Sequence, residues 1–246
     1  GKNVLSYKCG PDYIDPMFHK KVLGVPSKNL DTFFTDEKTT VQLFLDERAD
    51  GDFAVLEGVM GLYDGLGGIY EQGSSYHLAK VTQTPIILVV DAKGMGKSVL
   101  ALIAGFLQYD TQHLIKGVLL NRMSKGYYDI IKPLIEKELS VKVVGYFPEQ
   151  NDIGLSSRHL GLVMPDELSD IKKQLNETAD RLKKTIDMDL FIDIAEAADE
   201  IGDSGSADAY NEKNIGNCDQ NEFLQNKAIN TVNIAVAIGR SLLFLL

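Results

Sequence analysis

The chain alternates between short apolar runs and longer segments in which apolar and polar positions are mixed. A continuous apolar run is typical of a strand that is buried on both faces of a parallel sheet, and apolar positions three or four residues apart are typical of a helix that packs on it. The predicted strands cover residues 4–7, 53–57, 85–91, 114–120, 141–147 and 232–237. The predicted helices cover residues 36–48, 74–80, 98–109 and 127–139, residues 28–35 form a loop, and residues 165–197 are helical and charged. This alternation predicts an α/β fold with a doubly wound, mostly parallel sheet.

The length of 246 residues suffices for one large α/β domain with a substantial core. We expect this domain to cover residues 1–198, because residues 199–230 are rich in Gly, Ser, Asn, Gln and Asp and are typical of a polar linker. The strand at 232–237 then predicts that residues 231–246 begin a second, truncated domain. A strand that starts almost at residue 1 also predicts that sequence is missing upstream.

Composition excludes several classes of partner. With 25 basic and 35 acidic residues the net charge is -10, which argues against a protein that binds nucleic acid through its phosphates. No apolar stretch approaches the roughly 20 residues that span a bilayer, and no signal peptide is recognisable, so we expect no membrane partner. Cys9 and Cys218 form neither a metal-binding spacing nor a disulfide framework, which fits the cytoplasm.

The strongest candidate for chemistry is the segment 57–65, Glu-Gly-Val-Met-Gly-Leu-Tyr-Asp-Gly, which follows directly on the apolar run 53–56. In open parallel sheets the ligand lies outside the carboxyl ends of the strands. Glu57 and Asp64 would therefore lie where a ligand binds. The alternative is that both acids are solvated and that the glycines only form turns.

A second candidate is the segment 8–16, Lys-Cys-Gly-Pro-Asp-Tyr-Ile-Asp-Pro, at the end of the first predicted strand. Two prolines restrict the backbone around Asp12 and Asp15, so we expect a stiff loop that holds both carboxylates beside Lys8. Carboxylates suit Mg²⁺ and a lysine suits phosphate oxygens. The alternative is a turn bounded by prolines with solvated acids.

Three other features carry weaker signals. Gly96-Lys97-Ser98 is similar to the end of a phosphate-binding loop, but that pattern requires glycine where Asp91 stands, so we do not expect the main nucleotide site there. Ser74 is expected to cap a helix whose N-terminus could also bind an anion. Arg158 lies in a connection where its guanidinium could meet the carboxylates of a ligand.

Together these segments resemble the cobyrinic acid a,c-diamide synthase family, glutamine-dependent amidotransferases of cobalamin biosynthesis with a core similar to dethiobiotin synthetase. The matching segments occur in the family's order over residues 1 to about 195, and the strand at 232–237 resembles the opening of the family's class I glutaminase domain. The resemblance implies a P-loop NTPase-like fold whose P-loop precedes residue 1 and whose nucleophilic cysteine follows residue 246. The matching segments are 8–16, 57–65, 74–80, 89–92, 121–122 and 158–162.

The resemblance implies a carbon–nitrogen ligase reaction. The family uses ATP and Mg²⁺ to activate the a and c side-chain carboxylates of cobyrinate as acyl phosphates, and ammonia from glutamine then displaces the phosphate. The expected partners are therefore a corrinoid substrate, ATP as co-substrate, and glutamine or ammonia; a homodimer is left open. The truncated chain itself is expected to lack glutamine hydrolysis, because neither of its cysteines has a nucleophile context.

The resemblance also implies roles for individual residues. Glu57 would bind Mg²⁺ with Asp12 or Asp15 as a second ligand, Lys8 would contact phosphate, and Asp64 would orient the substrate carboxylate or accept a proton from ammonia. The nucleotide would be held by Asn121, Arg122 and Pro148. The corrinoid would be held by Tyr13, Ile14, His19, Ser74, Arg158 and His159.

Alternatives remain at this point. A sister amidotransferase that acts on hydrogenobyrinate or nickel-sirohydrochlorin would have similar loops. A regulatory ATPase of the MinD or ParA kind shares the fold, but it would need a membrane-binding helix or a basic face. Without the P-loop, the chain could also be an inactive module that binds a corrinoid.

Overall fold

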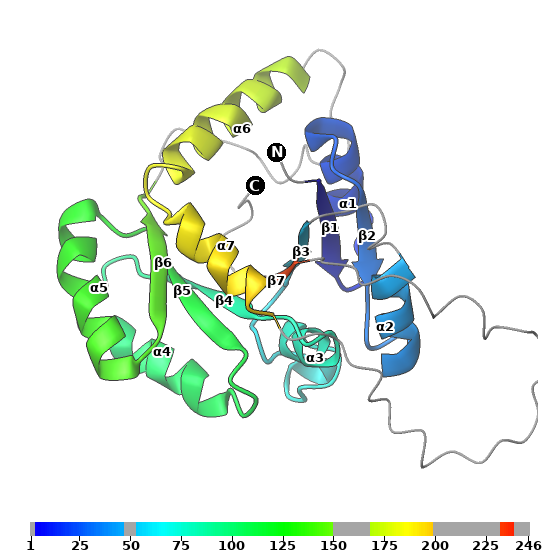
Figure 1. Cartoon of the computed structure of the whole chain (residues 1–246), viewed down its shortest axis with the longest axis horizontal. Helices are drawn as coiled ribbons and strands as arrows, with labels where there is room; N and C mark the ends of the chain where they lie inside the picture. The colour runs from blue at the N-terminus through cyan, green and yellow to red at the C-terminus, as the bar shows by residue number, and fades with distance from the viewer. Residues whose placement is uncertain (1–2, 47–52, 150–167, 199–231, 239–246) are drawn as a thin grey trace, which may run out of the picture.

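Figure 1 shows the computed structural model, which describes residues 3–46, 53–149, 168–198 and 232–238. Seven parallel strands form one sheet in the order β2-β1-β3-β7-β4-β5-β6. Their bounds are β1 Val4–Cys9, β2 Ser27–Leu30, β3 Phe53–Glu57, β4 Ile86–Asp91, β5 Ile115–Asn121, β6 Lys142–Phe147 and β7 Val232–Ile238. The predicted α/β class and parallel sheet are therefore confirmed.

The helices connect successive strands, as parallel pairing requires. The α-helices are α1 Ile14–Phe18, α2 Glu37–Asp46, α3 Ser75–Val81, α4 Ser98–Tyr109, α5 Lys125–Leu139, α6 Leu168–Leu182 and α7 Met188–Glu196. A π-helix, η1 His19–Leu23, continues α1, and a short 3₁₀ turn, η3 Leu66–Gly68, lies in the loop after β3. No helix in the described ranges has both the length and the apolar character that crossing a bilayer demands.

Both faces of the sheet are covered. Successive side chains of a strand point to opposite faces, so each strand contributes to a core on either side of the sheet. Tyr7 and Leu56 belong to the large core cluster, which also contains Phe44 of α2, Ile103 of α4 and Ile135 of α5. On the other face, a smaller cluster joins strands β3 to β6 to the buried side of α7. Helices therefore lie on both faces, as in a doubly wound fold. The pair α1–η1 packs against α6 in a third cluster.

The structure corrects the sequence prediction at two places near the N-terminus. Residues 28–35 were expected to form a loop, but β2 occupies Ser27–Leu30, an edge strand whose two central residues are polar and exposed. A stiff loop was expected to hold both Asp12 and Asp15, but α1 begins at Ile14, so Asp15 lies in a helix and only Asp12 precedes it. Pro16 lies in the first turn of this helix, where its missing N–H has no intrahelical partner to lose.

Strand β7 lies at the centre of the sheet. It pairs with β3 on one side and with β4 on the other, and so joins two groups of three strands, β2-β1-β3 and β4-β5-β6. The backbone of this strand thus belongs to the same sheet as the other six strands. The assignment of residues 231–246 to a glutaminase domain stays a prediction, as do the other domain limits.

Cys9 ends β1 with its side chain in the core, only 5% exposed, and burial raises the pKa of its thiol from 9.0 to about 11. Because the thiolate is the reactive form, iodoacetamide at pH 8 should modify native Cys9 about 100-fold more slowly than an ordinary thiol. The measurement uses a Cys218→Ser variant, which leaves Cys9 as the single thiol, and compares native with urea-unfolded protein by mass spectrometry. Equal rates in the two states would contradict the burial of Cys9.

Candidate functional site

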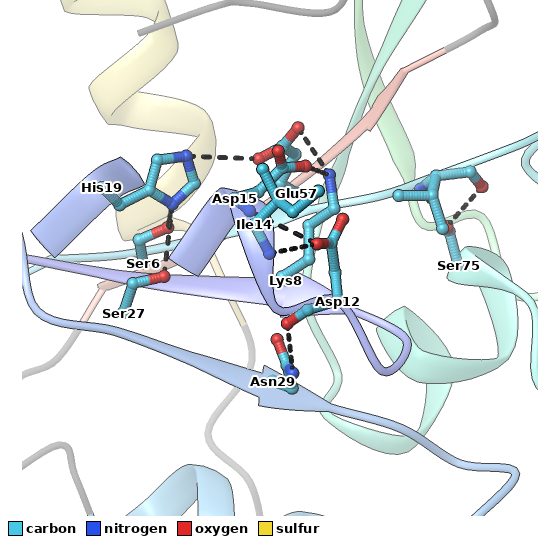
Figure 2. Close-up of polar contacts among 11 residues, drawn as sticks. Ser6, Lys8, Asp12, Ile14, Asp15, His19, Ser27, Asn29, Glu57 and Ser75 are labelled. Carbon is cyan, nitrogen blue, oxygen red and sulfur yellow. Dashed lines mark hydrogen bonds and ion pairs between the residues drawn. The ribbon is translucent and has the colours of Figure 1, made fainter. Parts of the chain in front are cut away.

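The parallel register of β1 and β3 brings a lysine and a glutamate side by side. Lys8 and Glu57 are Cα partners near the carboxyl ends of these strands, and Lys8 Nζ lies 2.9 Å from Glu57 Oε1. Asp15, in the first turn of α1, also forms an ion pair with Lys8. Figure 2 shows the ammonium joined by dashed lines to the carboxylates. Three of the predicted site residues therefore meet at the carboxyl ends of the strands.

The charges in this cluster do not balance, because one ammonium faces two carboxylates. Burial alone would lower the pKa of Lys8, but attraction by Glu57 and Asp15 outweighs it and raises the pKa, so the ammonium stays charged. Burial raises the pKa of Glu57, and Lys8 only partly offsets this. The cluster formally carries one excess negative charge, which a divalent cation or a second cationic group would compensate.

Asp12 has a different place from Asp15. Its Oδ1 accepts hydrogen bonds from the backbone N–H groups of Ile14 at 2.8 Å and Asp15 at 3.3 Å, so its side chain caps the start of α1. Its backbone carbonyl accepts a further bond from the side chain of Asn29 on β2. The sequence left Asp12 and Asp15 as alternative partners of Glu57, and the geometry favours Asp15.

His19 is buried behind Glu57, with 5% of its surface exposed. Its Nδ1 lies 3.0 Å from the hydroxyl of Ser6 and 3.2 Å from that of Ser27, and its Nε2 lies 3.5 Å from Glu57 Oε2. Burial lowers the pKa of His19, with Asp15 as the main opposing influence. A direct contact of His19 with substrate stays a prediction, and its ring nitrogens contact the two serines and Glu57.

The loop after β3 is folded tightly on itself. Gly65 N–H donates to the Tyr70 carbonyl at 2.9 Å, and a Cβ at Gly65 would lie 2.2 Å from the Gln72 carbonyl oxygen. A Cβ at Gly61 would lie 2.3 Å from Asp64 Oδ2, so glycine there leaves room for the Asp64 carboxylate. Asp64 itself is exposed to solvent. Glycine at positions 61 and 65 is therefore explained by the close packing of this loop. The role of Asp64 stays a prediction.

A second polar group lies at the ends of β4, β5 and β6. The guanidinium of Arg122 binds Asp91 with two hydrogen bonds, one of them from Nε to Oδ1 at 2.7 Å. Asn121 is buried, and its Oδ1 accepts from the backbone N–H of Arg122 at 2.9 Å. Pro148 follows Phe147, which is the Cα partner of Asn121. The structure thus brings together three of the four residues predicted to contact the nucleotide, whereas the fourth, Lys8, lies beside Glu57. The guanidinium of Arg122 is bound by Asp91.

The residues predicted to bind the corrinoid differ in how exposed they are. Tyr13 and Ile14 are 79% and 44% exposed beside Asp15, as residues that line a binding surface would be. Ser74 is 1% exposed and its hydroxyl accepts from His77 N–H, so it caps α3 as the sequence indicated. Arg158 and His159 lie outside the described residues.

The carboxylate oxygens in this cluster suit a hard cation that binds only a few protein side chains. Within the described part of the chain, no group of three or more His, Cys, Asp or Glu side chains is arranged to hold a metal. Mg²⁺ in nucleotide sites commonly takes one or two carboxylates and completes its shell with water and phosphate oxygens. Glu57 and Asp15, which converge in a cluster with excess negative charge, are residues that could hold it in this way.

Comparison with known proteins identifies relatives for most of the chain. A cobyrinate a,c-diamide synthase of Listeria innocua is 37% identical over 206 residues, which are 83% of this chain and 46% of the relative. The synthase of Thermoplasma volcanium is 41% identical over 201 residues, 80% of this chain and 43% of the relative. This chain is homologous to the cobyrinate a,c-diamide synthases. It spans less than half the length of these relatives.

The similarity to the synthases confirms the family resemblance drawn from the sequence motifs. A synthase of Clostridium tetani is likewise 37% identical over 204 residues, 83% of this chain and 46% of the relative. No protein-family model and no solved structure matches the chain.

The contacts of His19 and Asp91 are details of the candidate site that the sequence did not predict. Ser6 is a buried polar residue in the middle of β1, and Ser27 opens the edge strand that the hydrophobic pattern did not show. A polar residue in a buried strand indicates a hydrogen-bond partner, and this was the signal that could have pointed to His19. No comparable signal distinguished the pairing of Asp91 with Arg122.

Proposed function

We propose that this chain supplies the amide-forming part of an enzyme that amidates the a and c carboxylates of cobyrinate with ATP. The observation that carries the proposal is its 37–41% identity to cobyrinate a,c-diamide synthases over about four fifths of its length. The cluster of Lys8, Asp15 and Glu57 at the carboxyl edge of a parallel sheet supports it, because ligands bind at this edge in open α/β sheets. We further propose a P-loop NTPase-like fold similar to dethiobiotin synthetase.

The proposed reaction has two steps. In the first, an oxygen of the substrate carboxylate bonds to the γ-phosphorus of ATP while the bond from phosphorus to ADP breaks, which gives an acyl phosphate. In the second, the nitrogen of ammonia bonds to the carbonyl carbon, the carbon–oxygen bond to phosphate breaks, and a proton leaves the nitrogen. Mg²⁺, when bound, neutralises charge on the phosphate oxygens.

The residues of this chain would position and neutralise the reacting groups. Lys8 would exchange the Asp15 carboxylate for a phosphate oxygen, which is an equivalent partner for an ammonium, and would keep its contact with Glu57. Asp15 and the remaining lone pairs of Glu57 would then be available to the cation. Asp64 would orient the substrate carboxylate or accept the proton from ammonia, a role that suits an exposed carboxylate on a loop at this edge.

The second group of residues would hold the nucleotide. Asn121 and the loop at Pro148 would contact the adenine edge, and the pair Arg122–Asp91 would shape the loop beside them. Tyr13 and Ile14 would line the corrinoid, since both are exposed next to Asp15. In this arrangement the phosphates of ATP would lie between the two groups along the same edge of the sheet.

The test is an amidation assay with cobyrinate, ATP, Mg²⁺ and either glutamine or ammonium chloride, in a protein that contains this chain together with the segments its relatives have outside the match. Mass spectrometry counts the amides formed. We expect amides at two positions and ADP formation that depends on the tetrapyrrole. ATP hydrolysis that is indifferent to tetrapyrroles would contradict the proposal.

Parallel reactions decide between the substrates. Faster amidation of hydrogenobyrinate or nickel-sirohydrochlorin than of cobyrinate would assign the chain to a sister amidotransferase. Corrinoid binding without turnover in the same protein would identify an inactive binding module instead.

A further inference from the structure

We propose that His19 is a positioning residue that fixes the carboxylate of Glu57 for a divalent cation, and that Ser6 and Ser27 hold the ring of His19 in this orientation. The inference deepens the proposed function and rests on it, because it takes Glu57 as a cation ligand. His19 lies behind the cluster, and it acts through Glu57 without touching substrate or cation. The three residues come from three elements that the sheet and the first connection bring together, as Figure 2 shows.

The serines are placed by strand register. Ser6 of β1 and Ser27 of β2 are Cα partners, so their side chains lie on the same face of the sheet. His19 begins η1, which crosses this face after α1, and its Nδ1 lies within 3.2 Å of both hydroxyls. Ser6, His19 and Ser27 are 4%, 5% and 2% exposed, so water does not compete for these contacts.

The chemistry of the partners determines which ring nitrogen carries the proton. An ionised carboxylate only accepts hydrogen bonds, so the nitrogen that faces Glu57 Oε2, Nε2, has to be the protonated one. In the neutral ring Nδ1 is then the acceptor, and the serine hydroxyls, which can rotate, are its donors. At 3.5 Å the contact between Nε2 and Oε2 is long for a hydrogen bond, and it acts mainly as an electrostatic attraction in a nearly dry site.

The consequence is a carboxylate that is held at both oxygens. Lys8 Nζ lies 2.9 Å from Oε1, and His19 Nε2 lies 3.5 Å from Oε2. With both oxygens restrained, the plane of the carboxylate is fixed, and each oxygen retains lone pairs for a cation. Groups that orient a metal ligand in this way typically change metal affinity by about 10- to 100-fold when they are removed.

The first experiment reads the tautomer directly. Long-range ¹⁵N–¹H NMR of the chain should show the Nε2–H tautomer for His19, assigned by the signal that disappears in His19→Gln. In Glu57→Leu the carboxylate that requires a proton on Nε2 is gone, and since the serine hydroxyls can either donate or accept, the Nδ1–H tautomer should become populated. An Nδ1–H ring in the unmodified chain, or an unchanged ring in Glu57→Leu, would overturn the inference.

The second experiment uses Mn²⁺ alone as the probe, with its affinity measured by electron paramagnetic resonance. His19→Leu should weaken Mn²⁺ binding by about 10- to 100-fold, whereas His19→Gln, whose amide can still donate to Glu57, should recover most of it. The matched control is His113→Asn, since His113 is exposed and its left-handed backbone, with φ 54°, suits asparagine. Thermal unfolding of each variant shows that it is folded.

Two failures can be told apart. If Glu57→Gln leaves Mn²⁺ affinity unchanged, Glu57 is not a cation ligand, and this part of the proposed function falls together with the inference. If Glu57→Gln weakens Mn²⁺ binding but His19→Leu binds like the unmodified chain, the role of Glu57 stands and only the positioning role of His19 is overturned.

Discussion

Lys8→Met should reduce the free energy of unfolding by about 3 kcal/mol at pH 7, because it leaves two partly buried carboxylates without their shared cation. Lys8 is 4% exposed, and the side chains of Asp15 and Glu57 are 20% and 19% exposed. Methionine has a similar length and fills the space of the lysine stem, so the loss reports mainly the missing charge. Urea unfolding, followed by circular dichroism, measures it.

The same variant should become more stable as the pH falls from 7 towards 5. Burial already raises the pKa of Glu57, and removal of Lys8 removes the attraction that offsets it. A carboxyl group whose pKa is higher in the folded than in the unfolded chain binds more protons when folded, so its contribution to stability is lost as the pH rises through the folded pKa. The free energy of unfolding of this variant therefore falls as the pH rises from near the ordinary glutamate pKa of about 4.3 to the raised pKa of Glu57 in the folded variant.

Two variants serve as controls for Lys8→Met. Lys97→Met removes a lysine that is 73% exposed and 3.3 Å from Glu138, and it should change stability by less than about 0.5 kcal/mol. Lys8→Met/Glu57→Gln removes one of the two carboxylates as well, and it should recover part of the stability that Lys8→Met loses. A loss for Lys8→Met no larger than that for Lys97→Met would show that the ammonium does not hold the carboxylates together.

The sequence predicted the members of this cluster but not all of their partners. Lys8 and Glu57 each lie near the end of an apolar run, and parallel strands present such ends at one edge of the sheet. That rule predicts a shared edge, whereas the Cα pairing of Lys8 with Glu57 depends on which strands are neighbours and on their register. Hydrophobic patterns do not determine strand order, so the sequence could not place the two side chains in contact.

Asp12 and His19 show a second limit. The two prolines predicted constraint around Asp12, yet the constraint is the first turn of α1, which Asp12 caps. His19 follows in a π-helix, where a wider turn changes the side-chain direction that regular helical spacing would give. A period of 3.6 residues therefore cannot indicate that His19 faces two serines, one of them on an edge strand without an apolar pattern.

Glu57→Gln should reduce ATP-dependent amidation by about 100-fold or more in a protein that contains this chain and forms amides from cobyrinate. The amide keeps the size of the side chain and a hydrogen-bond acceptor for Lys8, but it removes the negative charge that a cation would bind. The concentration of Mg²⁺ at half-maximal rate should also rise. Glu138→Gln is the control, because Glu138 is a surface carboxylate on α5 that pairs with Lys97, and its variant should keep the full rate.

The same assay distinguishes the two aspartates near Glu57. Asp15→Asn should lower the amidation rate and raise the Mg²⁺ requirement, because Asp15 shares Lys8 with Glu57. Asp12→Asn should leave the amidation rate and the Mg²⁺ requirement nearly unchanged, since asparagine can still accept the backbone hydrogen bonds that cap α1. If Asp12→Asn lost activity as strongly as Glu57→Gln while Asp15→Asn kept it, Asp12 would be the second ligand. A full amidation rate for Glu57→Gln itself would show that the carboxylate cluster takes no part in the reaction.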